Sequence, residues 1–248
     1  MGLRVLYILS AVCVLLGCAG SYYQPGRVAH GRYDVKAGRI DSGVQALLGP
    51  YQQAVGGSME AVVAEIAASL PKSQPDNLLG YFMTDAFLVQ AAKVFGQQPD
   101  IALMNQGGIR INNLPAGPLK MRQLYELMPF DNQLVIIVLT GEQLQALLNH
   151  VAGRGGWAIS GGSYQIKNKQ AVNVQIGKQP LQSAARYRVA LSDYTANGGD
   201  DCAMLVGVPQ ENKGYLQRDA LIDYVKQWAA AGKQVPTPAA GRVTLLPQ

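Results

Sequence analysis

The sequence predicts an α+β fold, a layered mixed sheet with helices. Apolar residues recur at helical spacing in several long segments, which is typical of helices that cover a core with one face. Short apolar runs that lead into glycine-rich loops indicate buried strands. Short alternating segments after Ser160 indicate antiparallel strands. This mixture of helices with antiparallel strands is typical of α+β domains.

The first expected helix is capped by Asp41 or Ser42 and carries apolar residues at helical spacing over residues 44–55. Pro50 predicts a kink or a break in it, because proline has no N–H for the helical ladder. Residues 59–70 fit a helix by their apolar spacing, but they are rich in β-branched residues and follow two glycines. Helix and strand both remain open there.

A second helix is expected between a cap at Asp76 and a glycine terminator at Gly96. Residues 101–104 form an apolar run that opens into a glycine-rich loop, and we expect a buried strand there. Residues 134–139 predict another strand. The helix that follows it begins at a capping box over residues 140–143.

The C-terminal part of the chain is expected to contain a meander of short strands over residues 164–167, 172–176 and 187–191. Apolar residues that share one face over residues 221–228 indicate a last helix. Residues 243–246 predict a closing strand.

The N-terminus has the composition of a bacterial lipoprotein signal peptide over residues 1–17. Arg4 supplies the positive start, and residues 5–16 form an apolar stretch that is short for a membrane span. The apolar stretch ends in a small residue followed by Cys18. This ending resembles the bacterial lipobox, a motif in which the cysteine is lipidated. We therefore expect a lipid anchor on Cys18 and a polar tether over residues 18–40. The alternative is an ordinary secretory signal, and both place the chain outside the cytoplasm.

The remaining residues, 41–248, suffice for one sizeable domain. Apolar residues make up 48% of the 248-residue chain, enough for a proper core. The net charge of +5 mildly favours anionic ligands, but no run of lysine and arginine indicates nucleic-acid binding. Besides Cys13 and Cys18, only Cys202 is present. We therefore expect no intramolecular disulfide, and Cys202 is predicted to be a small buried hydrophobe.

The segment Asp193-Tyr-Thr-Ala-Asn-Gly-Gly-Asp200 combines an aromatic ring, two glycines and a carboxylate. The glycines allow a backbone turn that holds Tyr194 and Asp200 toward one point. The ring offers a stacking face and the carboxylate accepts hydrogen bonds, which suits a flat ligand such as a nucleoside. Taken alone, such a segment is more often simply a turn.

Four segments taken together resemble the C-terminal, substrate-binding domain of the 5′-nucleotidase / UDP-sugar hydrolase family. In chain order they are Asn105-Gln-Gly-Gly-Ile-Arg110, Pro129-Phe-Asp-Asn132, Ser160-Gly-Gly162 and Tyr194-Thr-Ala-Asn-Gly-Gly-Asp200. Each is weak alone, and their order and spacing make the match specific. The resemblance covers the chain from about residue 44 to the C-terminus and implies that family's fold for residues 41–248.

The resemblance also implies a role for each matching residue. The base would stack between Phe130 and Tyr194, Asp200 would bind the ribose hydroxyls, and Arg110 would offer a planar fork of donors to phosphate or ribose oxygens. A glycine in the Ser-Gly-Gly segment would let the backbone pass close to the base. The expected substrate-binding residues are Asn105, Arg110, Phe130, Asn132, Gly161, Tyr194 and Asp200.

The sequence departs from the family pattern at one place. The family usually carries a further arginine several residues before its Leu-Gly segment, and here Lys72 and Ser73 occupy that stretch. Lysine is a point charge without a fork of donors. Phosphate binding at that place is therefore expected to be looser.

The family's hydrolysis takes place on two metal ions in an N-terminal metallophosphatase domain. The corresponding aspartate, histidine and asparagine motifs are absent from this sequence, and the two histidines are His30, in the tether, and His150, at a helix end. The mature residues before Val44 are too few for such a domain. We therefore expect no catalytic or metal-binding residue and no cofactor in this chain.

Three functions remain open at this point. The first is the nucleotide-recognition half of a hydrolase in nucleotide catabolism, with divalent metals supplied by a separate metallophosphatase chain. The second is a non-catalytic, lipid-anchored protein that binds nucleosides or nucleotides at a bacterial membrane, in the periplasm or on the cell surface. The third is an interaction protein whose pocket has drifted, which the stretch at Lys72 and Ser73 favours.

Overall fold

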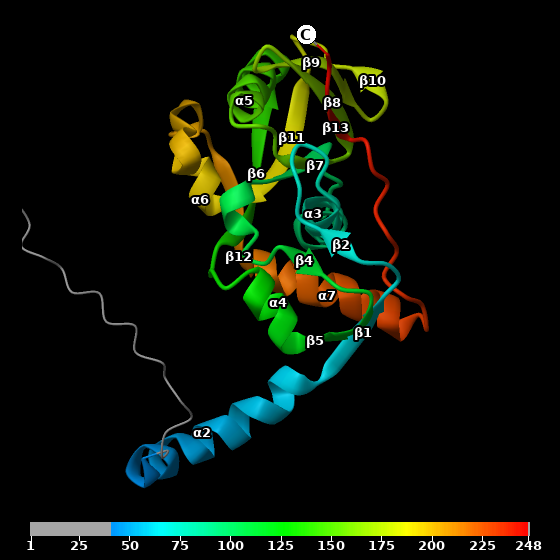
Figure 1. The fold of residues 1–248 in the computed structure, drawn as a ribbon. Coiled ribbons are helices and arrows are strands. Elements are labelled where there is room, and N and C mark those ends of the chain that lie inside the picture. The colour runs from blue at the N-terminus through cyan, green and yellow to red at the C-terminus, as the bar shows by residue number, and fades with distance from the viewer. Residues whose placement is uncertain (1–40, 248) are drawn as a thin grey trace, which may run out of the picture. The chain divides into compact units, whose positions relative to one another are not determined.

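The computed structural model describes residues 41–247, apart from the side chains of residues 53–55. The predicted signal peptide, the tether and Cys18 lie outside the described residues. Figure 1 shows helices packed against mixed sheets, which confirms the predicted α+β class.

The helices and strands follow one another in a mixed order. The helices are α2 (Ser42–Glu60), α3 (Leu78–Phe95), α4 (Met121–Leu127), α5 (Gly141–Gly153), α6 (Asp193–Ala196) and α7 (Gln217–Ala230), with short 3₁₀ helices η1 (Gln106–Gly108), η2 (Gly199–Asp201) and η3 (Ala203–Leu205). The strands are β1 (Val62–Ile66), β2 (Leu70–Pro71), β3 (Ile101–Met104), β4 (Asn113–Leu114), β5 (Gly117–Lys120), β6 (Gln133–Thr140), β7 (Ala158–Ser160), β8 (Gly162–Lys167), β9 (Gln170–Ile176), β10 (Gln179–Pro180), β11 (Arg186–Ser192), β12 (Gln210–Leu216) and β13 (Val243–Leu245).

A five-stranded sheet in the order β12-β6-β11-β3-β7 forms the centre of the domain. Strand β11 runs parallel to β3 and antiparallel to β6. A four-stranded sheet in the order β10-β9-β8-β13 lies beyond β7 in the chain, and β1-β5 and β2-β4 form two-stranded pairs. By its internal contacts the compact unit begins at Leu47.

The predicted meander is wrong for its last strand. β8 and β9 pair antiparallel as expected, but β11 leaves them and inserts between β6 and β3 of the larger sheet. The physical reason is the composition of β11, in which Val189, Ala190 and Leu191 are all buried in succession. A strand without polar alternation is suited to a central place with both faces covered.

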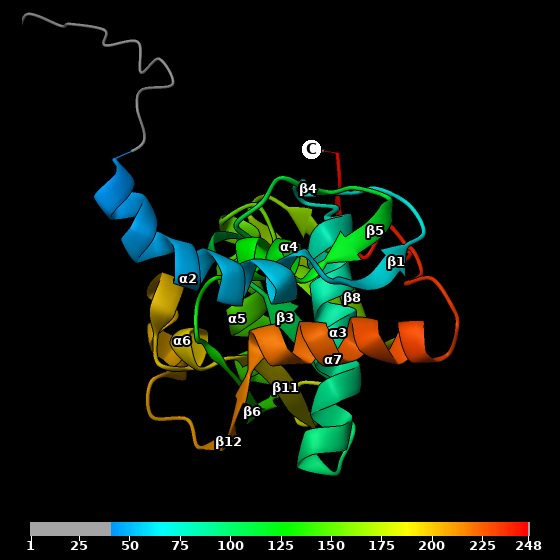
Figure 2. The same ribbon diagram turned by 90° about the horizontal axis from the view of Figure 1, so that it is seen from below.

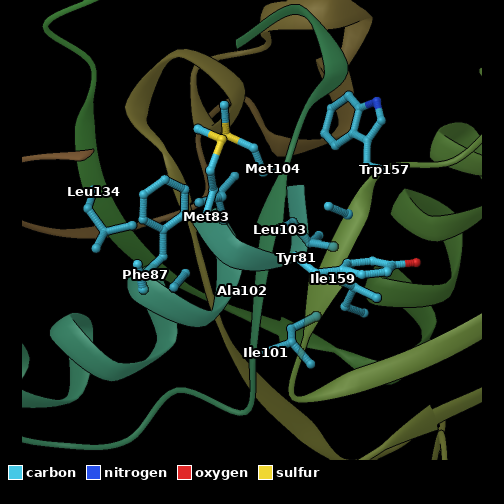
Figure 3. Close-up of a cluster of buried hydrophobic side chains, with 14 of the residues drawn as sticks. Tyr81, Met83, Phe87, Ile101, Ala102, Leu103, Met104, Leu134, Trp157 and Ile159 are labelled. Atoms are coloured by element: carbon cyan, nitrogen blue, oxygen red, sulfur yellow. The ribbon is translucent and has the colours of Figure 1, made fainter. Parts of the chain in front are cut away.

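Helix α3 forms the core of the domain. Figure 3 shows Tyr81, Met83 and Phe87 of this helix packed against β3 and the segment around β7. Helix α7 crosses α3 (Figure 2), where the rings of Phe82 and Tyr224 meet edge to face with centroids 6.1 Å apart. By length and composition α3 could span a membrane, but 61% of it is buried inside the structure, as in a core helix.

The bounds and caps of the N-terminal elements differ in part from those that the sequence predicts. Helix α2 continues through Pro50 without the break allowed for there. The ambiguous residues 59–70 contain the end of α2, β1 and the start of β2. Helix α3 is capped by Asn77, whose side chain accepts from the backbone nitrogen of Gly80, and not by Asp76. Asp76 instead accepts from the backbone nitrogen of Gly241 at 2.8 Å.

Candidate functional site

The sheet topology brings three loops to one edge of the larger sheet. The loop at Asn105 follows the end of β3, and the segment with Tyr194 follows the end of β11. Because β6 is antiparallel to β11, with Leu134 opposite Ser192, the residues before β6 reach the same edge. Segments far apart in the chain therefore converge there.

A pocket of about 330 Å³ lies among these loops. Every predicted site residue except Gly161 lines it, together with two glycines of the first loop. The lining residues are Asn105, Gly107, Gly108, Arg110, Phe130, Asn132, Tyr194 and Asp200. The structure thus brings six of the seven residues together, and their binding role stays a prediction.

Two partly exposed aromatic rings belong to the pocket. Phe130 is 42% exposed and Tyr194 is 47% exposed, although large aromatic side chains are usually buried. The Arg110 guanidinium lies over the Phe130 ring, 5.5 Å from its centroid. This cation–π contact places a positive charge beside one wall of the pocket.

In the first loop, two side chains pack closely against Gly108. A side chain at Gly108 would meet Met104 Cε at 2.3 Å and Asn105 Oδ1 at 2.9 Å. Gly108 thus leaves room for the side chains of Met104 and Asn105, and Asn105 is buried here, with 6% exposure. The Asn105 amide donates to Asp200 Oδ2 at 2.5 Å, so the first loop and the last loop are joined inside the pocket.

Lys72 lies beside this loop from outside the pocket lining. Its ammonium donates to the Ile109 carbonyl at 2.8 Å. Partial burial, and then the charge of Arg110, lower the pKa of Lys72. Among the described residues, no carboxylate forms an ion pair with Lys72 or Arg110. Two cations without a carboxylate partner therefore lie near one another at this edge.

The Phe130 segment is fixed by a residue that sequence reasoning missed. Arg218, at the start of α7, donates to Asp131 Oδ1 at 2.6 Å and to the carbonyls of Met128 and Phe130 at 3.3 and 3.4 Å. Arg218 is only 8% exposed. No sequence pattern linked it to the Pro129-Phe-Asp-Asn132 segment, which precedes it by almost ninety residues.

The last loop holds Asp200 in an unusual backbone conformation. Asp200 has φ 52° and ψ 37°, and Asp201 has φ 58°, so two successive non-glycine residues are left-handed. The Asp200 carbonyl lies 2.9 Å from His150 Nε2, and Arg154 forms an ion pair with Asp201. His150 and Arg154 thus contact this loop from the end of α5, which their places in the sequence did not indicate.

Gly161 is not brought to this pocket. It lies between β7 and β8, where the chain leaves the larger sheet for the smaller one. Its φ is +79°, and a side chain there would meet the Asp100 carbonyl oxygen at 2.1 Å. The Ser-Gly-Gly segment therefore requires glycine for the turn between sheets, and this geometry gives no reason to place the base beside it.

A larger hollow, of about 490 Å³, lies over the smaller sheet and is lined mainly by neutral residues of β8 and β9. Its cation, Arg242, already donates to both carboxylate oxygens of Asp85, at 2.6 and 2.8 Å. Its larger volume therefore does not make this hollow the better candidate for a ligand site. The smaller pocket combines aromatic rings, a carboxylate and a cation without a carboxylate partner. Across residues 41–247, no group of three or more histidine, cysteine, aspartate or glutamate side chains is placed to hold a metal ion.

Comparisons with known proteins point in one direction. The family model described as "5'-nucleotidase, C-terminal domain" matches residues 55–207. A 5'-nucleotidase of Vibrio parahaemolyticus is 30% identical over 145 residues, which are 56% of this chain and 26% of that protein. A 5'-nucleotidase of Vibrio vulnificus is 28% identical over 75% of this chain and 34% of its own length.

The solved structures agree with the family match. The crystal structure of a 5'-nucleotidase precursor from Thermus thermophilus superposes with a TM-score of 0.72 and 28% identity, over 84% of this chain and 44% of that one. The chain thus spans about a quarter to a third of the two Vibrio relatives and under half of the Thermus chain.

Proposed function

Because the chain belongs to the family of 5'-nucleotidase C-terminal domains, we propose that its pocket binds the nucleoside part of a nucleotide. In this proposal the chain is the nucleotide-recognition part of a phosphoester hydrolase in nucleotide catabolism. One observation carries it: the partly exposed rings of Phe130 and Tyr194 line one pocket with the Asp200 carboxylate and the Arg110 guanidinium.

The two rings supply the base-binding part of the proposed site. Stacking of a base on an aromatic side chain contributes roughly 1–3 kcal/mol and tolerates different bases. Asn132 lines the same pocket, and its side-chain amide has no hydrogen-bond partner within residues 41–247. An amide with free donor and acceptor groups is suited to the polar edge of a base.

The carboxylate supplies the sugar-binding part. Asp200 Oδ2 accepts from Asn105 at 2.5 Å and Oδ1 accepts from the Tyr194 hydroxyl at 3.3 Å. Each carboxylate oxygen accepts more than one hydrogen bond, so both keep capacity for the hydroxyls of a ribose.

The cations supply the phosphate-binding part. Arg110 lines the pocket, and the Lys72 ammonium lies close enough for the charge of Arg110 to lower its pKa. A phosphate placed beside them would relieve the repulsion between two like charges. Lys72 already donates to the Ile109 carbonyl, so Arg110 is the principal phosphate ligand in this proposal.

Hydrolysis in this proposal requires a second chain. A metallophosphatase with two divalent metal ions would bind the phosphate end of the nucleotide and activate water, while this chain holds the nucleoside end. A lipid on Cys18 would hold this chain at a bacterial membrane outside the cytoplasm, where nucleotides are scavenged.

The experiment has a binding arm and a turnover arm. We expect calorimetric titration of the full chain to show AMP binding, and we expect the pure chain with AMP and a divalent metal to release no phosphate. Robust turnover by the pure chain would overturn the two-chain proposal. If the chain binds AMP but no added metallophosphatase hydrolyses AMP with it, the result would instead support a non-catalytic, lipid-anchored binding protein. The Phe130→Ala variant should lose binding, while Phe95→Ala, outside the pocket, should bind AMP in its folded fraction.

A further inference from the structure

The hydroxyl of Tyr194 makes two contacts with one residue. It accepts a hydrogen bond from the backbone nitrogen of Asp200 at 3.2 Å and lies 3.3 Å from Asp200 Oδ1, to which it donates. A phenol has one donor and accepts as well, so both contacts form together. The hydroxyl therefore fixes the backbone and the side chain of Asp200 at the same time.

The Tyr194 ring is itself held in place. A side chain at Gly199 would meet Cε1, Cζ and Cδ1 of the ring at 2.4 to 2.6 Å, so the glycine backbone lies directly against it. The hydroxyl thus belongs to a ring whose position is set by the Gly-Gly-Asp turn. Ring and turn support each other.

Asp200 needs such support because its conformation is costly. A left-handed backbone at a non-glycine residue costs roughly 1–2 kcal/mol. The polar groups of Asp200 are matched by neighbours: Tyr194 at the nitrogen and Oδ1, Asn105 at Oδ2, and His150 near the carbonyl. The carboxylate is therefore oriented before any ligand arrives.

We propose that the Tyr194 hydroxyl is a positioning group that makes the pocket select sugars with a vicinal diol. This inference rests on the proposed nucleoside site, and it separates two roles of one residue. The ring stacks on the base, and the hydroxyl orients Asp200 toward the 2′- and 3′-hydroxyls. A phenylalanine at this position would keep the first role and lose the second.

The test compares ligands that differ only in the diol. Calorimetric titration of the full chain measures the affinities for adenosine and 2′,3′-dideoxyadenosine, and their ratio is the readout. We expect Tyr194→Phe to lower the affinity for adenosine by about 3- to 10-fold, the range of one lost hydrogen bond. The affinity for dideoxyadenosine should fall by less than about twofold. Tyr194→Ala should weaken both ligands together.

A double-mutant cycle tests whether the hydroxyl acts through Asp200. Asp200→Ala should reduce the ratio, and adding Tyr194→Phe to it should reduce the ratio no further. Tyr187→Phe is the matched control, since its hydroxyl accepts from the backbone nitrogen of Gln182 outside the pocket, and its ratio should equal that of the wild type.

The outcomes separate this inference from the proposed function. If the wild type binds neither ligand, the nucleoside site itself is wrong. If the wild type binds both and Tyr194→Phe leaves their ratio unchanged, the positioning role is overturned while the site stands. Because the ratio is measured within one protein, a variant that is merely less stable does not alter it.

Discussion

The carboxylate of Asp193 accepts a hydrogen bond from the backbone nitrogen of Gln133 at 2.9 Å. The same oxygen accepts from the backbone nitrogen of Tyr194 at 2.8 Å. One side chain thereby joins the segment that leads from Phe130 into β6 with the first turn of α6. The separation of the two ring-bearing segments is fixed by this carboxylate and by the pairing of β6 with β11.

Asp193→Ala is expected to lower the free energy of unfolding by about 1–2 kcal/mol, because it leaves two backbone N–H groups without their acceptor. It should also weaken AMP binding, since the ring-bearing segments lose their common attachment. Asp193→Asn keeps an acceptor oxygen and should lose less of both. Urea denaturation and calorimetry measure the two effects. Equal values for the alanine variant and the wild type would rule out this attachment.

Arg110→Gln is expected to reduce the affinity for AMP about tenfold, equivalent to about 1.4 kcal/mol, and to leave adenosine much less affected. The reason is that the guanidinium is proposed to bind the phosphate. Arg122→Gln is the matched control, since Arg122 pairs with Glu60 and Glu126 outside the pocket. Calorimetry at two salt concentrations should show that the Arg110 effect shrinks as salt rises. An equal loss for AMP and adenosine would contradict a phosphate role.

Lys72→Arg is expected to raise the affinity for AMP by about threefold or more and to leave adenosine unchanged. The lysine spends one donor on the Ile109 carbonyl, whereas an arginine keeps further donors in a planar fork after making that contact. Titration with both ligands measures the change. An AMP affinity at or below the wild-type value would show that this position does not reach the phosphate.

Gly161→Ala is expected to destabilise the fold by more than about 2 kcal/mol, because left-handed strain adds to a clash with the Asp100 carbonyl. Gly177→Ala is the control for strain alone, since its φ is +56° but nothing lies within 4 Å of the added carbon. We expect this variant to lose about 1 kcal/mol of stability. Thermal unfolding compares them. Equal losses would show that the clash is relieved at no cost.

Cys202 gives a prediction about pH. Burial, and then the charge of Asp200, raise the pKa of the Cys202 thiol from its ordinary value of 9.0 to about 11. A raised pKa contributes stability that is fully present below about pH 9 and is lost as the pH rises to about 11. Between about pH 9 and pH 11, the free energy of unfolding of the wild type should therefore fall relative to that of Cys202→Ala. A pH-independent difference would contradict a protonated, buried thiol.

Most residues that line the pocket were predicted, because four short segments in one order resemble the family of 5'-nucleotidase C-terminal domains, although each segment is weak alone. Asn105, Arg110, Phe130, Asn132, Tyr194 and Asp200 were predicted from such segments, and the structure places them around one pocket. The strand pairing that joins them depends on β11, whose expected place in a meander was wrong. Local alternation does not reveal which sheet a strand joins, since that depends on what covers both of its faces.

The residues that support the site were not predictable in the same way. Arg218 and His150 act on loops that are distant in sequence and carry no motif of their own. Gly161 is the opposite case: it belongs to a motif, but it lies outside the pocket, and the tight turn between two sheets already requires glycine there. A motif records that a residue type is needed and does not say whether a ligand or the fold needs it.

Base stacking between Phe130 and Tyr194 is tested most directly by calorimetric titration of the full chain with adenosine, compared with Phe130→Ala and Tyr194→Ala. We predict that the wild type binds adenosine and that the affinity of each variant is about 5- to 150-fold lower, equivalent to roughly 1–3 kcal/mol per lost stacking contact, while both variants remain folded. Wild-type binding that both variants retain in full would contradict a base held between these two rings.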